Sequence, residues 1–508
     1  MTARALSCVL AGVSARPIEV EVDVAGGLPH FAIVGLPGGA VRESKDRVRA
    51  ALRNAGHPAP ERRITVNLAP AHLRKEGAAF DLAIAAGLLA ADGRIPPPSL
   101  EKAFLLGELS LDGGLKPLQG VLPMALAARR AGARRLLLPR ANAAEAALVA
   151  GLDAIALDSL GHAIDVLAGR ATVEPTRLDA HALLSASRST DVDFADVRGQ
   201  AVARRALEIA AAGGHNALLL GPPGSGKTML ARRVPTILPD LSLDEALEAT
   251  AVHSVAGLLG EAPLVATRPF RAPHHTASEA ALVGGGRLAR PGEISLAHRG
   301  VLFLDELPEF PVGALEALRQ PLEERRIAVA RACAHHVFPA DALVVAAMNP
   351  CPCGFLGDPT HLCSCPPGAA ARYRQRISGP LLDRLDLHVE VPALPWAELV
   401  GPAGGEGSAA IRARVAAARD RQRERLGRPG AHCNAHMNGR EIDRHCPLDG
   451  PAERLLETAV ERLGLSARAF SKVRKVARTI ADLAGRDRIA SGDVAEALQY
   501  RSLDRRPA

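Results

Sequence analysis

The stretch Gly221–Thr228, with the sequence GPPGSGKT, decides the fold predicted for this chain. An apolar run, residues 216–220, leads into it, and a helix-forming run, residues 229–232, follows it. This order of strand, glycine-rich loop and helix satisfies the full G-x-x-x-x-G-K-[ST] pattern of a phosphate-binding loop, so a chance Gly/Pro turn is disfavoured. The glycines let successive backbone N–H groups point at phosphates, next to the positive end of the following helix. The stretch therefore predicts a nucleotide-binding domain built on a parallel sheet.

Two side chains of this loop have distinct predicted roles. Lys227 is expected to reach the β- and γ-phosphates of ATP, and Thr228 is expected to ligate Mg2+. ATP with Mg2+ is thus the predicted ligand. The remaining nucleotide-binding residues contribute mainly backbone groups: Gly221, Pro222, Pro223, Gly224, Ser225 and Gly226.

Polar side chains also follow two later apolar strands. Residues 300–306 form a strand that ends in Asp305 and Glu306, and residues 342–347 form another that is followed by Met348 and Asn349. Asp305 is expected to hold Mg2+ through its water shell, and Glu306 to polarise the attacking water. Asn349 is expected to orient that water as the residue called sensor 1. Helix capping by the two acids, and a plain Asn-Pro turn, are the simpler alternatives.

The composition predicts a soluble globular chain of about three domains. Of its 508 residues, 48% are hydrophobic and 23% charged. No apolar run approaches the length of a membrane span, and no signal peptide is recognisable, so we expect a cytoplasmic protein without a membrane partner. The net charge of +7 favours a polyanionic partner only weakly. Eight cysteines in such a chain favour metal binding or free thiols over disulfides.

Residues 1–170 are predicted to form an α/β domain of their own. Strict alternation over residues 18–24 indicates a strand, whereas the glycine-rich loop 35–39 lacks a G-K-[ST] ending and is interpreted as a strand-to-helix turn. The domain resembles the proteolytic domain of Lon proteases. It has Ala79 and Met124 at the positions where those proteases carry the nucleophilic serine and its partner lysine. A Ser–Lys dyad needs a hydroxyl beside an amine, so we expect the fold without peptidase activity. The resemblance rests on four segments in the same order and spacing: 64–70, 75–84, 106–111 and 127–133.

Five segments carry a resemblance that extends over nearly the whole chain: 270–278 (FRAPHHTAS), 301–307 (VLFLDEL), 347–354 (AMNPCPCG), 379–386 (GPLLDRLD) and 476–483 (VARTIADL). They are similar to those of the magnesium-chelatase-like AAA+ ATPases of the YifB/ComM type. The resemblance implies a homo-oligomeric ring ATPase, with a hexamer as the expected form. It also implies a DNA helicase that promotes branch migration during recombination of transforming DNA.

The same resemblance assigns two arginines. Arg384 matches the family's arginine finger, which would reach the nucleotide site of the neighbouring subunit and stabilise charge on the transferring phosphoryl group. Arg468 opens a lid helix with the S-x-R pattern of the residue called sensor 2. Lys472 and Arg474, further along that helix, remain rivals for the role.

The predicted fold class is α/β throughout the first two domains. It combines the Lon-protease-like α/β domain with an AAA+ parallel-sheet core and a C-terminal helical lid. Residues 171–193 form the expected linker, residues 194–393 the ATPase core and residues 394–508 the lid. Within the lid, the arginine-rich run 411–428 predicts a solvated amphipathic helix, and residues 480–498 predict a helix that closes the domain.

A cysteine-rich loop, residues 351–365, follows Asn349 directly. It contains two C-x-C pairs separated by nine residues, with turn-forming glycines and prolines between them. Four thiolates at this spacing can close a tetrahedral Zn2+ site, although reduced thiols without metal are the alternative. A second, weaker metal candidate combines Cys433 with His432, His436, His445 and Cys446. The four residues predicted to hold structural Zn2+ are Cys351, Cys353, Cys363 and Cys365.

Two basic segments are candidates for gripping DNA in the pore of a ring, or else for lining subunit interfaces. The first spans residues 268–290 and includes Arg271, His274, His275, Arg287 and Arg290. The second is a predicted hairpin over residues 325–336. No aromatic platform lies in either segment, so DNA contacts should be directed to the backbone and independent of sequence.

Two other functions share parts of this pattern. A metal-insertion motor resembling the magnesium chelatase subunit would use the same ATPase core, but the Lon-like domain and the C-x-C pairs count against it. A peptidase or protein-remodelling ATPase is disfavoured by Ala79 and Met124.

Overall fold

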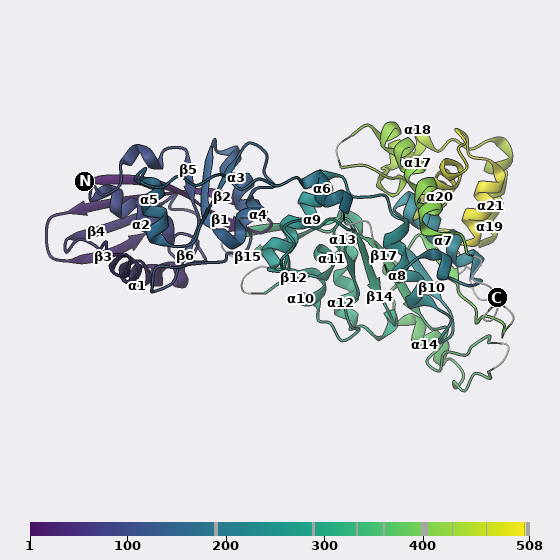
Figure 1. Ribbon diagram of the computed structural model, residues 1–508. Helices are drawn as coiled ribbons and strands as arrows, with labels where there is room; N and C mark the ends of the chain where they lie inside the picture. The colour runs from purple at the N-terminus through teal and green to yellow at the C-terminus, as the bar shows by residue number, and fades with distance from the viewer. Residues whose placement is uncertain are drawn as a thin grey trace.

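The alternating apolar residues 18–24 lie in β2, within a seven-stranded mixed sheet that organises the N-terminal part of the chain. A computed structural model describes all residues except 187–190, 287–289, 332–333, 359–360, 397, 399–404, 429, 464, 502 and 504–508. The molecule is elongated, with the N-terminal domain at one end, the ATPase core beside it and the C-terminal helices at the other end (Figure 1).

The order of the N-terminal sheet is β3-β4-β2-β1-β5-β8-β9. Every residue of helix α2 (Asp81–Ala91) is buried, and Gly87 lets it approach the sheet, since a Cβ there would lie 2.9 Å from Val22 Cγ2. The strands are β1 (Thr2–Ala11), β2 (Ser14–Ala25), β3 (His30–Val34), β4 (Arg63–Ala69), β5 (Ala103–Leu105), β8 (Arg135–Pro139) and β9 (Asp153–Leu157), with a small hairpin of β6 (Glu108–Leu109) and β7 (Leu115–Lys116). The other helices are α1 (Gly39–Asn54), α3 (Val121–Arg130), α4 (Arg140–Ala146) and α5 (Leu160–Leu167).

The two positions at which a Lon protease would carry its Ser–Lys dyad hold buried apolar side chains in this protein. Ala79 is 7% exposed and Met124 is 3% exposed, and both belong to a cluster that joins the N-terminal domain to the ATPase core. In this cluster α3 packs against α9 (Leu243–Ala256) of the core. The predicted linker also contributes, because α6 (Ala180–Ala186) lies within it and packs Leu183 and Leu184 against the same cluster. The dyad positions therefore serve interdomain packing.

The short apolar runs of the core form one five-stranded parallel sheet. Its order is β11-β14-β17-β10-β18, with Ala217 opposite both Val345 and Leu387. Because all five strands run the same way, the loops after β10, β14 and β17 emerge at one edge. The strands are β10 (Ala217–Leu220), β11 (Phe270–Arg271), β14 (Val301–Leu304), β17 (Leu343–Met348) and β18 (Leu387–Glu390).

Helices and two hairpins surround this sheet. The helices are α7 (Ala201–Gly213), α8 (Lys227–Ile237), α10 (Glu279–Val283), α11 (Glu293–Leu296), α12 (Val312–Ala317), α13 (Arg319–Glu324), α14 (Ala369–Gln375) and α15 (Gly379–Leu382). The hairpins are β12 (Gly284–Gly285) with β13 (Arg290–Pro291), and β15 (Arg326–Arg331) with β16 (Ala334–Pro339).

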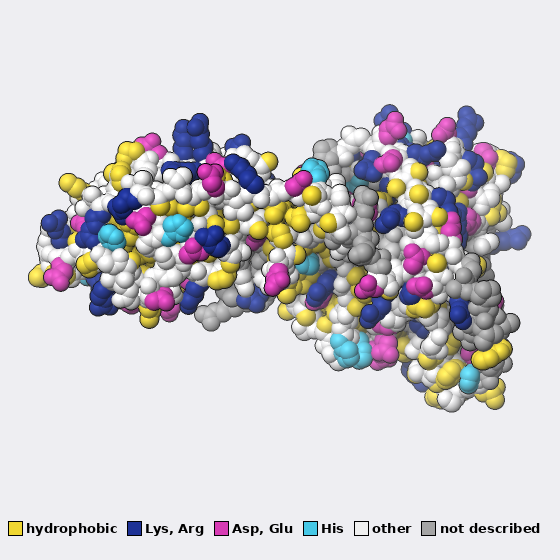
Figure 2. Space-filling view, viewed as in Figure 1, with side chains coloured by type: hydrophobic (Ala, Val, Ile, Leu, Met, Phe, Trp, Pro, Cys, Tyr) yellow, Lys and Arg dark blue, Asp and Glu magenta, His cyan; other side chains and the backbone are white. Residues whose placement is uncertain are grey.

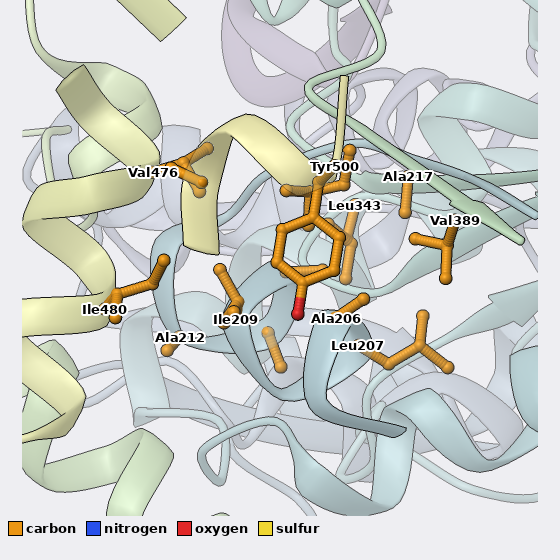
Figure 3. Close-up of a cluster of buried hydrophobic side chains, with 14 of the residues drawn as sticks. Ala206, Leu207, Ile209, Ala212, Ala217, Leu343, Val389, Val476, Ile480 and Tyr500 are labelled. Carbon is orange, nitrogen blue, oxygen red and sulfur yellow. The ribbon is translucent and has the colours of Figure 1, made fainter. Parts of the chain in front are cut away.

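Helix α7 is the packing link between the sheet and the C-terminal lid. Its residues Leu207 and Ile209 belong to one buried cluster with Val389 of the sheet and with Val476 and Ile480 of the lid (Figure 3). The lid helices are α17 (Ser408–Leu426), α18 (Gly439–His445), α19 (Gly450–Leu463), α20 (Ala467–Leu483) and α21 (Ser491–Gln499).

The stretch 480–498, predicted to be helical, contains parts of two helices with a break between them. Helix α20 ends at Leu483, and α21 begins only at Ser491. Gly485, with φ of 72°, takes the left-handed conformation that ends helices. The chain therefore reverses here, and α21 packs back against α20 and α19.

Candidate nucleotide site

The glycine-rich loop after β10 has the geometry of a phosphate cradle. Gly224 and Gly226 have φ of 75° and 92°, which lets the loop curl into the N-terminus of α8. Gly221 passes so close to the end of β18 that a Cβ would lie 2.0 Å from the Val391 carbonyl oxygen. The hydroxyl of Ser225 is buried and makes no hydrogen bond to any described residue. The loop thus fits a ligand rich in hydrogen-bonding oxygens.

Lys227 lies folded over this cradle. Its ammonium donates to the carbonyl oxygens of Gly221 at 2.7 Å and Pro222 at 2.8 Å, and to Asn349 Oδ1 at 3.2 Å. Burial lowers the pKa of Lys227, and the carboxylates of Asp305 and Glu306 oppose that shift. An ammonium held by neutral oxygens is ready to exchange them for phosphate oxygens.

The predicted magnesium ligands lie together. The hydroxyl of Thr228 donates to Asp305 Oδ2 at 2.7 Å, although 77 residues separate them in sequence. The backbone N–H of Glu306 donates to Asp305 Oδ1 at 3.0 Å, which orients the Asp305 carboxylate at the end of β14. A hydroxyl and a carboxylate at this spacing suit a hard divalent cation such as Mg2+.

The structure adds one residue that the sequence did not assign to this site. Nδ1 of His275, a candidate for gripping DNA or lining a subunit interface, lies 3.1 Å from Oε2 of Glu306, the predicted water-polarising acid. Glu306 itself has φ of 53°, an uncommon conformation for a residue other than glycine. Thirty-one positions separate the two residues, and no spacing rule links them. This contact gives His275 a geometry that can orient the Glu306 carboxylate.

Replacement of His275 by alanine should leave ATP binding intact and slow hydrolysis. A misoriented base loses part of the 10²–10⁴-fold that general-base catalysis typically supplies, so we expect kcat to fall by about tenfold. Steady-state kinetics together with equilibrium ATP binding would separate kcat from affinity. His274→Ala is the control, because His274 bonds Thr276 and not Glu306. Equal kinetics of both variants would contradict this role.

Arg384 lies at the opposite edge of the sheet from the phosphate loop. Its carbonyl accepts from Asn216 Nδ2 at 3.2 Å, and Asn216 stands just before β10, whereas the loop begins after β10. The five-residue rise from Asn216 to Gly221 corresponds to about 16 Å of parallel strand. The guanidinium of Arg384 forms an ion pair with Glu323 and donates to the Arg319 carbonyl at 3.0 Å. It is therefore remote from the nucleotide loop of its own chain.

Arg468 lies on the same side as Arg384. Both line a cavity of about 500 Å3 at the junction of core and lid, and no phosphate-loop residue lines that cavity. The two rival residues have other partners: Lys472 pairs with Asp386 at 2.7 Å, and Arg474 with Asp443 at 2.9 Å. Within the described part of the chain, Arg468 forms no ion pair. Among Arg468, Lys472 and Arg474, Arg468 is the one whose charge is not paired with a described acidic side chain.

The four cysteines of the loop 351–365 converge. Sulfur–sulfur distances are 3.4 Å for Cys351–Cys353, 3.7 Å for Cys351–Cys363 and 3.5 Å for Cys353–Cys363. Cys365 completes the group, with all four sulfurs within 4.8 Å of one another. A metal–sulfur distance of about 2.3 Å places the sulfurs of a tetrahedral site about 3.8 Å apart, so the arrangement fits Zn2+.

The weaker metal candidate is only partly assembled. His432, Cys433 and His436 lie within 4.8 Å of one another, but that group does not extend to His445 or Cys446. Arg299 Nη1 lies 3.0 Å from His432 Nε2, so a guanidinium cation already occupies the approach to one ligand atom.

Most described basic side chains of the two predicted DNA-gripping segments are engaged within the chain. Arg268 donates to the Arg299 carbonyl at 2.6 Å, and burial lowers its pKa to about 10; Arg271 pairs with Glu293 at 2.7 Å. Arg326 and Arg290 are exposed, whereas Arg287 lies outside the described residues. Arg268 and Arg271 of the first segment are therefore held by contacts within the chain.

No described helix combines the length and the apolar composition that a membrane span requires.

Three family models cover most of the chain. Residues 193–399 match the model described as magnesium chelatase, subunit ChlI; residues 20–142 match subunit ChlI of Mg-chelatase; and residues 405–501 match its C-terminal region. These ranges fall on the ATPase core, the N-terminal domain and the lid.

Curated relatives match over nearly the full length. The competence protein ComM of Haemophilus influenzae is 46% identical over 97% of this chain and 96% of its own. YifB of Escherichia coli is 45% identical over the same shares. Lon protease 2 of Bacillus subtilis is 31% identical over 24% of this chain and 22% of its own, in keeping with the partial Lon resemblance. The chain belongs to the magnesium-chelatase-like AAA+ family that includes YifB and ComM.

Proposed function

We propose that this protein is the ATP-hydrolysing subunit of a ring-shaped motor that acts on DNA. Its family implies an ATPase that uses ATP and Mg2+. The proposal of a ring rests on one observation. The phosphate loop and the two acids lie at one edge of the core sheet, and Arg384 lies at the other. A head-to-tail neighbour would bring its own Arg384 to this site, and repetition of that contact closes a ring, with a hexamer as the proposed size.

The residues at the loop edge have complementary roles in this proposal. Lys227 exchanges the loop carbonyls for phosphate oxygens, while Thr228 and Asp305 hold Mg2+. When bound, Mg2+ neutralises charge on the transferring phosphoryl group. Glu306 accepts a proton from the attacking water, and Asn349, already fixed by its hydrogen bond to Lys227, orients that water. Hydrolysis of this kind is achieved mainly by positioning and charge stabilisation.

On the partner side, Arg384 and Arg468 share the role of stabilising phosphate charge. They line one cavity at the edge of the sheet that a neighbour's nucleotide would face. Arg384 would have to leave Glu323 to reach it, so engagement of the neighbour competes with an ion pair inside the chain. This competition makes hydrolysis depend on assembly.

DNA is the proposed polymer, and branch migration during recombination of transforming DNA is the proposed activity. The support is the identity to ComM, a competence protein, and the exposure of Arg326 on the β15–β16 hairpin, where it forms an exposed ion pair with Glu324 at 3.5 Å. On the face seen in Figure 2, basic and acidic side chains are interspersed, so no broad basic surface is visible there. Local contacts to the DNA backbone, independent of sequence, fit this distribution.

We also propose that the four-cysteine cluster holds one structural Zn2+. The sulfur distances fit a tetrahedral centre, and a closed set of four protein ligands is typical of structural rather than catalytic zinc.

ATPase activity should rise several-fold when branched DNA is added to the full-length protein. A motor that hydrolyses ATP productively only on its track shows this stimulation, and Lys227→Ala should abolish both basal and stimulated activity. Strand displacement on the same branched substrate provides the second measurement. Hydrolysis that is indifferent to single-stranded, duplex and branched DNA would exclude the DNA motor and favour a metal-insertion motor.

A further inference from the structure

The cysteine-rich loop is in direct contact with the phosphate loop. Gly354, which ends the first cysteine turn, has φ of 87° and packs against Pro223. A Cβ at Gly354 would lie 2.5 Å from Pro223 Cδ and 2.7 Å from Pro223 Cγ. Real Cβ contacts are not that short, so only glycine lets the two loops approach this closely.

The strand that carries the cysteine loop is also bonded to the phosphate loop. The Gly221 N–H donates to the carbonyl of Met348 at 3.2 Å, and Lys227 donates to Asn349 Oδ1. Cys351 follows two residues later and is fully buried. The two loops are therefore joined at three places: at Met348, at Asn349 and at Gly354.

The cysteine loop is held by its sulfurs and by contacts among Phe355, Asp358 and His361: the Asp358 N–H donates to the Phe355 carbonyl at 3.1 Å, and the Phe355 and His361 rings lie 4.8 Å apart. Its described residues form turns without helix or strand. Within the first turn, Gly354 N–H donates to the Cys351 carbonyl at 3.0 Å, and Cys353 N–H donates to Cys365 Sγ at 3.4 Å. The second bond aims an N–H at a sulfur, as thiolate ligands of a metal require. The sulfur cluster thus ties the first C-x-C pair directly to the second.

We propose that the zinc centre braces the phosphate loop and thereby sets the affinity for ATP. This inference rests on the proposed zinc site. With the four sulfurs bound to one ion, Gly354 is held against Pro223, and the loop keeps its curvature without nucleotide. Without the ion, the turn from Cys351 to Gly354 loses its tie to Cys363 and Cys365, and Pro223 loses its support. Ordering the loop must then be driven by nucleotide binding itself.

The contact is tested with Gly354→Ala in the full-length protein. Binding of a fluorescent ATP analogue should weaken by about tenfold, which corresponds to a modest loss of preorganisation. The zinc content, measured by mass spectrometry, should stay at the wild-type value because all four cysteines remain. Gly357→Ala is the matched control: Gly357 also has positive φ, 79°, in the same loop, but a Cβ at that position would have no described atom within 4 Å.

The metal is tested with the double variant Cys363→Ser and Cys365→Ser. We expect it to lose zinc and to bind the analogue more weakly by a similar factor, with an unchanged circular dichroism spectrum. The proposal that the zinc centre braces the phosphate loop would be overturned by either of two results. Gly354→Ala and Gly357→Ala could bind the ATP analogue equally well, or the zinc-free double variant could bind it with wild-type affinity. A wild-type protein that contains no zinc and takes none up would overturn the site as well. These assays contain no DNA, so their outcome does not depend on whether the protein is a DNA motor.

Discussion

Arg384→Ala should lower kcat for ATP hydrolysis by about 10³-fold and leave ATP affinity unchanged. An arginine finger stabilises charge that develops only in the transition state, and its removal typically costs 10³–10⁵-fold in kcat. Affinity should survive because an interaction made mainly in the transition state contributes little to ground-state binding of ATP. Steady-state kinetics and binding of a fluorescent ATP analogue measure the two quantities.

Mixing experiments determine which subunit supplies the arginine. Lys227→Ala removes the phosphate-loop lysine and Arg384→Ala removes the finger, so each variant alone should be inactive. In a mixed ring, about one quarter of the interfaces pair an intact loop with an intact finger, provided that the subunits mix at random. ATPase activity should therefore return in the mixture.

Two controls make the mixing result decisive. Size-exclusion chromatography must show that both variants assemble as the wild type does. Mixing Lys227→Ala with Glu306→Ala serves as the negative control, because both changes lie at the loop edge. If both variants assemble but their mixture stays inactive, the site is not shared between subunits.

Asp386→Asn should destabilise the joint between core and lid by about 3 kcal/mol. Asp386, whose side chain is 13% exposed, pairs with Lys472 at 2.7 Å and with His215 Nδ1 at 3.1 Å, and His215 Nε2 lies 2.9 Å from Thr479 of the lid. Although burial raises the pKa of Asp386, the ammonium of Lys472 and the ring of His215 outweigh it and hold this pKa far below its usual value. Removal of the carboxylate leaves the Lys472 ammonium without its ion-pair partner.

The sign of the pH dependence follows from the lowered pKa. The contribution of Asp386 to stability is fully present above its unfolded pKa of about 3.9 and is lost only as the pH falls below that value. At neutral pH, calorimetry should show the unfolding transition of core and lid about 4–5 °C lower in the variant.

A surface ion pair on the same helix provides the control. Arg474 of α20 pairs with Asp443, whose side chain is 77% exposed. Exposed pairs contribute about 0–1 kcal/mol, so Asp443→Asn should shift the transition little. Equal shifts in the two variants would contradict a special role for the buried network.

Local sequence patterns predicted several of the elements and the grouping of Lys227, Thr228, Asp305 and Asn349. The run 216–220 lies in and just before β10, and the helix-forming run 229–232 lies in α8. The Asp305–Thr228 contact also agrees with expectation, because parallel strands bring their carboxyl ends to one edge. In each case the signal lies within about ten residues, where apolar periodicity and loop chemistry act directly.

Contacts between distant segments could not be predicted in this way. The sequence by itself determined the phosphate loop, the paired acids, the cysteine spacing and the family resemblance, because those depend on neighbouring residues. Only the tertiary structure decided that His275 faces Glu306, that Gly354 supports Pro223, and that Arg468 lies beside Arg384. The physical reason is that such pairings depend on how the sheet and its loops pack in three dimensions, and side-chain type along the chain does not encode which loops will touch.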